Sequence, residues 1–240
     1  MSAHARIAGL LVLLTVVAVA GCAEPSNEVL FSKLSARAET GLAEAQYNLG
    51  MLYNNGIGTA QNPRLAFQWF EKAAKGGDPL GSYKVGCYYA GQFQEVVPPD
   101  SEKALAQKLV AAKAGYMLAQ HDVAIAYTER GDPREAAKWW QMAAEQGDVT
   151  ALVALANGYK QGVGVLSDPA KSYEYLLVAS RLLSESQARG LKPQLDQQRK
   201  AIDLDAATLA EKAAAGWTLQ PTALTMRARE GIDEARRIAR

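Results

Sequence analysis

The chain is built from paired stretches in which small and aromatic side chains recur at helical spacing between polar ones. Residues 43–53 read Ala-Glu-Ala-Gln-Tyr-Asn-Leu-Gly-Met-Leu-Tyr, and a loop around Gly56-Ile57-Gly58 follows. A second apolar stripe begins after Asn62 and ends at residues 76–78, which read Gly-Gly-Asp. Apolar positions spaced in this way predict helices, and the glycines predict where those helices stop. Residues 43–78 are therefore expected to form one helix–turn–helix unit.

The same unit recurs through the chain. A small residue of the first helix returns at spacings of 36, 38 and 32 residues, and the Asn or Asp that opens the second helix returns at spacings of 38, 32 and 36. From the tyrosine that closes the first helix to that Asn or Asp is 9, 11, 5 and 9 residues. Length changes are thus confined to the loop between paired helices, because packed helices must match their neighbours. The small residues are Gly50, Gly86, Ala124 and Ala156, and the opening residues are Asn62, Asp100, Asp132 and Asp168.

Residues 36–183 resemble the Sel1-like repeat (SLR) family, relatives of the tetratricopeptide repeats. The resemblance is strongest in the first unit, which carries Ala-Glu-Ala-Gln-Tyr-x-Leu-Gly-x-Leu-Tyr, then Gly-x-Gly, then Trp-Phe-x-Lys-Ala-Ala. The second unit lacks the aromatic pair at Gln107-Lys108, the third has a short turn without Gly-x-Gly, and the fourth has Tyr175 in place of tryptophan. The resemblance implies an all-α fold, a right-handed α-solenoid of about four helix–turn–helix repeats with capping helices, and it implies binding to other proteins.

The ends of the repeat pattern divide the mature chain into three segments. We expect residues 29–183 to form the solenoid and residues 184–217 to form C-terminal capping helices. Residues 218–240 are a tail that either docks as an amphipathic helix or frays. The stretch from Asn27 to Thr40 is expected to be the lone second helix of a truncated unit, which covers the first face of the solenoid.

Residues 1–21 have the features of a cleaved leader. A weakly positive start is followed by a 14-residue apolar run, which is too short for an ordinary membrane-spanning helix. The run ends in Val19-Ala20-Gly21-Cys22, which resembles the bacterial lipobox. The resemblance implies cleavage before Cys22, acylation of Cys22 and a lipidated tether over residues 22–28. The alternative is an ordinary secretory leader with a chance cysteine.

Lipidation would also set the location of the protein. Several acyl chains on one residue suffice for stable membrane anchoring, and the short tether holds the domain close to the bilayer. Ala23 rather than aspartate follows Cys22, and by resemblance to Gram-negative lipoproteins this favours the inner leaflet of the outer membrane. We therefore expect a periplasmic, lipid-anchored protein.

Composition and charge narrow the class of partner. The 240 residues are 49% hydrophobic, which is enough for one well-buried domain. The formal charge is +1, and removing Arg6 with the leader leaves 25 Lys and Arg against 25 Asp and Glu. A neutral chain argues against nucleic acid as a partner and against a broadly basic membrane-binding surface.

Residues able to carry catalysis or bind metal are sparse. His121 is the only histidine outside the leader, and its neighbour Asp122 lies about 100° around a helix from it, so the two do not face each other. Structural zinc needs about four Cys and His ligands, which this chain cannot assemble. We expect no catalytic residue, no cofactor and no metal. Cys87 is the only thiol besides Cys22; we expect a half-buried hydrophobic residue, with a reactive or intermolecular thiol as the alternative.

Two Gly-x-Gly sequences are expected to be turns rather than phosphate-binding loops. Gly56-x-Gly58 and Gly162-x-Gly164 each follow a helix, whereas a dinucleotide-binding loop follows a strand. The Asn and Asp residues that open the second helices are expected to cap them, because their side chains accept hydrogen bonds from otherwise unpaired backbone N–H groups. A proline follows three of these caps, at Pro63, Pro133 and Pro169, where its missing N–H costs nothing.

A mixed polar strip on the first helices is the candidate binding surface. In a repeat protein the fixed positions pack, which leaves the variable positions free to contact a ligand. The resemblance implies that first helices line the inner, concave surface. Mixed charge suits a specific protein partner better than a polyanion, which would require one sign. The strip comprises Asn48, Lys84, Asp122, Glu129 and Gln161.

Four functions are consistent with these predictions. The first is a non-enzymatic scaffold or adaptor of the cell envelope that binds a protein through its concave face. Within the same class, resemblance to related lipoproteins implies either an assembly factor for exopolysaccharide export or an immunity protein that neutralises a secreted effector acting in the periplasm. A hydrolase ranks last, because this chain lacks the paired cysteines of the relatives linked to β-lactam binding.

Overall fold

The protein is described here by a computed structural model, which covers residues 26–240. Within that range every regular element is an α-helix, which confirms the predicted all-α solenoid. Four helix pairs form the repeats: α2 (Ala43–Asn55) with α3 (Pro63–Lys75), α4 (Pro79–Tyr89) with α5 (Ser101–Lys113), α6 (Met117–Glu129) with α7 (Pro133–Glu145), and α8 (Val149–Gln161) with α9 (Pro169–Leu182). The flanking helices are α1 (Asn27–Glu39), α10 (Glu185–Lys200), α11 (Leu204–Gly216), α12 (Ala223–Glu230) and α13 (Ile232–Ile238).

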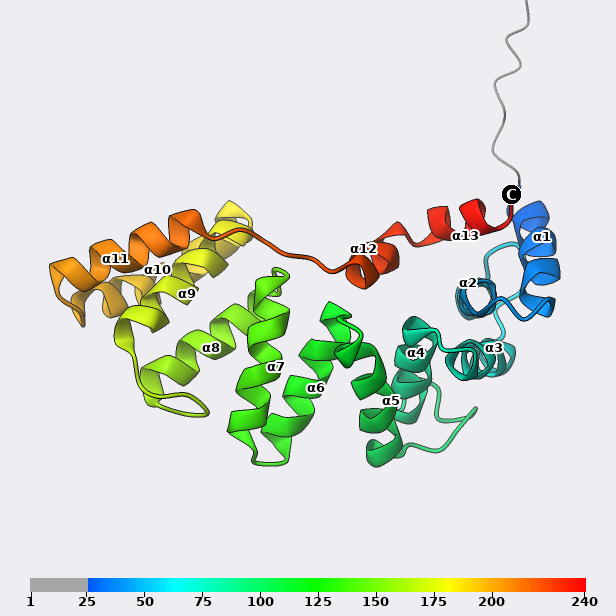
Figure 1. The fold of residues 1–240 in the computed structure, drawn as a ribbon, viewed down its shortest axis with the longest axis horizontal. Helices are drawn as coiled ribbons and strands as arrows, with labels where there is room; N and C mark the ends of the chain where they lie inside the picture. Colours follow the sequence, from blue (N-terminus) through cyan, green and yellow to red (C-terminus); the bar gives the residue numbers. More distant parts are fainter. Residues whose placement is uncertain (1–25) are drawn as a thin grey trace, which may run out of the picture.

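Each helix packs mainly on its neighbours along the chain, as expected for a solenoid. The two helices of a pair pack on each other, and the second helix of one unit packs on the first helix of the next. The result is an arch whose ends are formed by α1–α3 and by α9–α11 (Figure 1). Helices α10 and α11 both pack on α9 and close that end of the repeat array.

The second helices begin where the sequence predicted. In all four the side chain of the opening residue accepts a hydrogen bond from the backbone N–H three residues later, at 2.9–3.1 Å. This pairs an N–H group that the helix itself leaves unpaired. Three of the four caps are followed by proline at the first helical position, as predicted. The capping residues are Asn62, Asp100, Asp132 and Asp168.

The Gly-x-Gly sequences are turns, as predicted, and the second glycine of each is also a packing site. Gly58 and Gly164 have φ of +69° and +77°, in the left-handed region that side chains rarely adopt. A Cβ at Gly58 would lie 2.0 Å from the carbonyl oxygen of Asn27, and one at Gly164 would lie 2.2 Å from that of Pro133. Each loop therefore closes against the start of a preceding second helix, and only glycine fits there.

Aromatic side chains and small residues fill the core together. Trp139 is 9% exposed within the largest cluster, which confirms the prediction that it is buried. In the same cluster Tyr175 stacks on Tyr159 with ring centres 5.6 Å apart. Packing also requires the small residue that recurs in the first helices, because a Cβ at Gly50 would lie 2.6 Å from the ring of Phe70. The repeats thus pair an aromatic ring with a glycine or alanine that lets the helices approach.

The chain does not end at the far arm of the arch. Residues 217–240, which we call the C-terminal segment, return from α11 across the span of the arch and bring α13 against α1 and α2 (Figure 1). The sequence left open whether this region docks or frays; in the structure it docks as two short helices. Ile232 and Ala235 of α13 join the apolar cluster of Leu30 and Leu34 from α1. We expected α1 alone to cover the first face of the solenoid; α13 covers it as well.

The expected leader, Cys22 and most of the expected tether lie outside the described residues. None of the helices within residues 26–240 is long and apolar enough to cross a membrane.

Candidate protein-binding grooves

The first helices line a series of hollows, and we call the one between the second and third units the open groove. This open groove has a volume of about 260 Å³ and lies between the end of α4, the start of α5 and one face of α6. Its walls are largely apolar, with Leu105 on α5 and Ile125 on α6. Ile125 is 37% exposed, so an aliphatic side chain faces a hollow that no other part of the described chain fills.

Two of the residues predicted for the binding strip line this open groove. Asp122 forms an ion pair of 2.8 Å with Lys108, and both side chains are largely shielded from water. Glu129 is exposed at the other end of the groove and makes no ion pair in the described structure. The arrangement offers an apolar floor, one neutralised pair and one free carboxylate, which together suit a segment carrying an aliphatic side chain beside a basic one.

The groove is repeated, because the same four helix positions line a hollow in three units. Positions 122, 125, 126 and 129 of α6 become positions 154, 157, 158 and 161 of α8, where they line a second hollow of about 180 Å³. Gln161, a predicted strip residue, lies there beside the exposed Val163. In α2 the equivalent residues are Asn48, Met51, Leu52 and Asn55, which line the hollow that we call the first groove.

The first groove is covered by α13, and the prediction for Asn48 is wrong. This hollow measures about 150 Å³ and is closed on its far side by residues of α13, Ile232 and Glu234 among them. Asn48 is 3% exposed, and its side-chain N–H donates to the carbonyl oxygen of Glu44 at 2.9 Å. The repeat pattern places Asn48 on the correct face, but a segment from outside the repeats covers that face.

Lys84 is more buried than a free strip residue would be. Its ammonium nitrogen lies 5.7 Å from the centre of the Phe70 ring, and burial lowers the pKa of Lys84. Substituting it would therefore disturb packing as well as charge. Reversing Asp122 would likewise place a cation beside Lys108. Glu129 and Ile125 are the better positions at which to test binding, because both are exposed.

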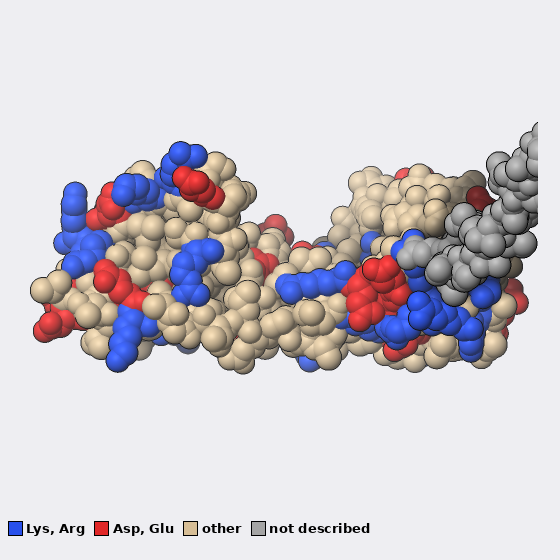
Figure 2. All heavy atoms as spheres, turned by 90° about the horizontal axis from the view of Figure 1, so that it is seen from above, with Lys and Arg blue, Asp and Glu red and all other residues tan. Residues whose placement is uncertain are grey.

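The charged surface is mixed. Seen from above, Lys and Arg are interspersed with Asp and Glu over the visible face, and neither sign forms a broad area of its own (Figure 2). A surface of this kind favours a partner with a complementary pattern over a uniformly charged polymer.

The remaining candidate residues have structural partners. His121 Nδ1 lies 2.7 Å from a carboxylate oxygen of Asp148, the residue that caps α8, and not near Asp122. Cys87 is half-buried, and burial raises the pKa of its thiol, which disfavours the reactive thiolate. Among residues 26–240 no group of three or more His, Cys, Asp or Glu side chains could hold a metal ion.

Sequence reasoning missed the residues that dock the C-terminal segment. Thr222, Thr225 and Arg227 contact turns between repeats that lie far away in the chain. One signal was available: α4 and α8 each open with an aspartate cap, whereas α6 opens with Tyr116, which makes no side-chain cap. α2 likewise opens without a side-chain cap, at Leu42, and no other segment of the described chain caps it, so a missing cap marks a candidate position for such a contact and not the contact itself.

The fold is an α-solenoid whose first helices line a row of grooves. The chain belongs to the Sel1 repeat family: residues 43–78, 79–106, 111–148 and 149–182 match the Sel1 repeat. Proteins built from Sel1 repeats generally mediate protein–protein interactions.

Two relatives match parts of the chain. The chain is 30% identical over 126 residues to the sel1-like repeat-containing protein L21 of Acanthamoeba polyphaga mimivirus, and 26% identical over 182 residues to the DAP3-binding cell death enhancer 1 of Rattus norvegicus. These matches cover 52% and 74% of this chain but only 22% and 34% of the two relatives, so it spans about a third or less of their length.

Two solved structures have a similar fold. A Sel1 repeat protein from Oxalobacter formigenes superposes with a TM-score of 0.62 at 25% identity, over 78% of each chain. A protective antigen of uropathogenic Escherichia coli that displays an SLR fold superposes with a TM-score of 0.51 at 22% identity, over 85% of this chain and 50% of the other.

Proposed function

We propose that this protein is a non-enzymatic, lipid-anchored scaffold of the periplasm that holds a protein partner in its open groove. The observation that carries the proposal is the repeated use of four helix positions to line grooves. The first groove is covered by α13, whereas the open groove and the smaller hollow along α8 are lined by residues of the repeats alone. An uncovered groove with an apolar floor and a polar rim is the usual form of a surface that receives a helix or loop of another protein.

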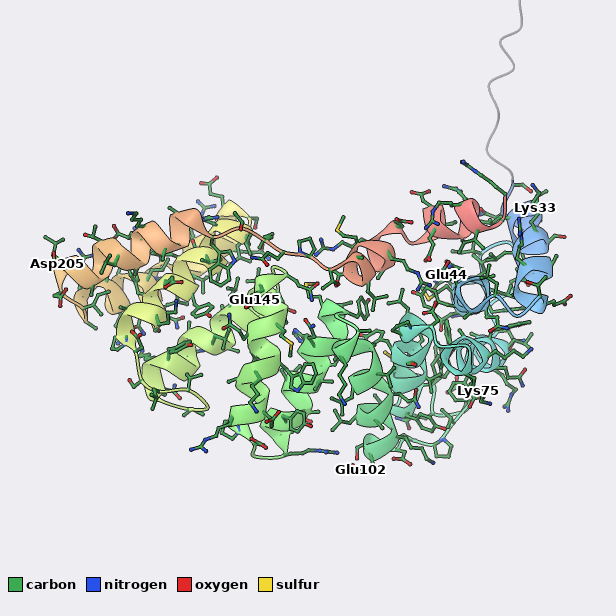
Figure 3. All side chains as sticks on the ribbon, in the orientation of Figure 1. Lys33, Glu44, Lys75, Glu102, Glu145 and Asp205 are labelled. Carbon is green, nitrogen blue, oxygen red and sulfur yellow. The ribbon has the colours of Figure 1, made fainter. Side chains whose placement is uncertain are left out.

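The open groove and the C-terminal segment occupy different edges of the arch. Glu102, which follows the groove residue Ser101, lies at the edge opposite the C-terminal segment, whereas Glu145 lies at the edge that this segment crosses (Figure 3). A partner seated in the open groove therefore meets no obstacle from the chain's own C-terminus.

The anchoring part of the proposal rests on the sequence. The apolar run and the lipobox-like ending at Cys22 support export and acylation, and Ala23 supports the outer membrane as the destination. Helix α1 begins at Asn27, five residues after Cys22, so an acylated Cys22 would hold the solenoid close to the bilayer surface.

Affinity purification of the membrane-anchored chain tests the binding part. We expect a protein to co-purify with the wild type and to be depleted at least tenfold by Ile125→Glu, which places a charge on the apolar floor. Val110→Glu is the matched control, since Val110 is also exposed but does not line the open groove. Equal recovery of the partner with both variants would place the interface elsewhere.

A further inference from the structure

The C-terminal segment follows the repeats in register. The turns that join one repeat to the next each contain a glycine with φ between +89° and +96°, at Gly77, Gly115 and Gly147. Leu219 packs against Gly147, Thr222 packs against Gly115, and Arg227 reaches Asp78, the residue after Gly77. The segment therefore contacts three successive turns, in the order opposite to that of the repeats. A peptide bound along a row of equivalent sites would make contacts of the same kind.

The contacts at the middle and far turns are hydrogen bonds in which at least one partner is a backbone group. The hydroxyl of Thr222 donates to the carbonyl oxygen of Gly115 at 2.9 Å, and its N–H donates to the side chain of Gln146 at 3.0 Å. The N–H of Gln220 donates to the carbonyl oxygen of Glu145 at 2.8 Å. Thr225 Oγ1 accepts from the N–H of Met117 at 3.0 Å and so caps α6. Such bonds fix the register of an incoming chain.

The contact at the near turn is a buried charge cluster. The Arg227 guanidinium pairs with Asp78 and with Glu234, whose side chains are 1% and 2% exposed, and it lies 5.6 Å from the centre of the Tyr47 ring. Burial lowers the pKa of Arg227, but the hydrogen bonds and charges of Asp78 and Glu234 outweigh it and raise that pKa, so the group stays charged. One carboxylate oxygen of Asp78 caps α4 by accepting from two backbone N–H groups, and the other pairs with Arg227. A segment that docks here in place of the C-terminal segment is therefore expected to bring a cation.

The segment itself is poorly suited to be a permanent part of the fold. Its two helices have eight and seven residues, lengths that are unstable in isolation, so their helical form depends on the docking surface. Residues 218–220, which lead into it, are exposed, and a hollow of about 150 Å³ remains between α13 and α2. A segment that folds on its docking surface can leave that surface when a competitor is present.

We propose that the row of turns at Asp78, Gly115 and Gln146, together with the first groove, is a second peptide-binding surface, which the protein's own C-terminal segment occupies until a partner segment displaces it. The partner is identified by its chemistry. It carries Thr-x-x-Thr-x-Arg, the spacing of Thr222, Thr225 and Arg227, followed by a helix with small aliphatic residues on one face. This surface is separate from the open groove and does not depend on what that groove binds.

A labelled synthetic peptide of residues 218–240 tests this exchange with the full chain as receptor. The full-length variant Thr225→Val/Arg227→Glu, with its own segment loosened, is expected to bind the peptide at least about 100-fold more tightly than the wild type, whose tethered segment competes at high effective concentration. A peptide carrying Arg227→Glu should bind neither. Adding Asp78→Asn to the receptor, which keeps the cap of α4 but removes the charge, should weaken binding at least tenfold.

Hydrogen exchange on the wild type tests whether the C-terminal segment is released, even if the receptor variant fails to fold. The proposal requires amides of residues 223–238 to exchange at least 100-fold faster than those of α6 and α7, through release of the segment alone. Exchange of these amides only at the rate of α6 and α7 would show an integral cap and overturn the proposal. Failure of the peptide to bind a folded variant with a released segment would also overturn it.

Discussion

The backbone N–H of Met117, at the start of α6, donates a hydrogen bond of 3.0 Å to the hydroxyl of Thr225, a residue 108 positions later in the chain. Helices α4 and α8 are capped by the aspartate that precedes each of them, but α6 has no capping side chain of its own. The C-terminal segment thus completes a repeat that the local sequence leaves incomplete, and it links the stability of the third unit to its own docking.

Thr225→Val is expected to lower the free energy of unfolding by about 1–2 kcal/mol, because it leaves the partly buried N–H of Met117 without its cap. Thr225→Ser is the matched control and should stay within about 0.5 kcal/mol, since it retains the hydroxyl. Chemical denaturation of the two variants measures the difference. Equal stabilities would show that water replaces the hydroxyl at no cost.

Trp139→Ala is expected to destabilise the protein by about 3–5 kcal/mol, because it removes a large side chain that is 9% exposed within the main core. The loss should spread beyond the third unit, since solenoid repeats stabilise their neighbours. Leu166→Ala serves as the control: Leu166 is 90% exposed, and its change should cost less than about 0.5 kcal/mol. Thermal melting within a degree or two of the wild type for Trp139→Ala would contradict the packing described here.

Gly164→Ala and Gly190→Ala are expected to have opposite effects. At Gly164 the φ of +77° and the nearby Pro133 carbonyl forbid a Cβ, so alanine should cost about 2 kcal/mol or more. Gly190 lies inside α10, and a methyl group added there would meet no neighbouring atom within 4 Å, so alanine should stabilise by about 0.5–1 kcal/mol. Denaturation midpoints of the two variants measure these changes in stability. An unchanged midpoint for Gly164→Ala would show that the loop is free to move.

Local and periodic features were predictable from the sequence. The caps at Asn62 and Asp168 could be predicted because a capping side chain bonds to a backbone group three residues away. The burial of Trp139 followed from its register within the repeat. The positions that line the grooves also followed from the register, because the same positions of the first helices face a hollow in three of the four units.

Contacts between distant segments could not be predicted in this way. Arg227 and Asp78 are 149 residues apart, and no periodicity connects the C-terminal segment to the turns that it crosses. The exposure expected for Asn48 was wrong for the same reason, because its cover comes from α13. A repeat pattern predicts which face a residue is on, but it carries no information about a non-repeating segment that covers that face.

Cys22→Ser tests the proposed anchor. Because the thiol is the site to which the acyl group would be attached, the variant is expected to remain an uncleaved precursor or to leave the membrane fraction. Metabolic labelling with palmitate, followed by fractionation, measures both outcomes. Cys87→Ser is the matched control and should keep both the label and the location. Label that persists in Cys22→Ser would contradict acylation at this residue.

Site-specific photo-crosslinking in the native cell envelope tests the central claim most directly. A photoreactive amino acid at position 125 lies on the floor of the open groove, and one at position 166 lies on an exposed loop residue outside it. The account predicts a crosslinked protein adduct from position 125 and none from position 166. An adduct from position 166 with none from position 125, or no adduct from either, would contradict the claim that the open groove holds a protein partner.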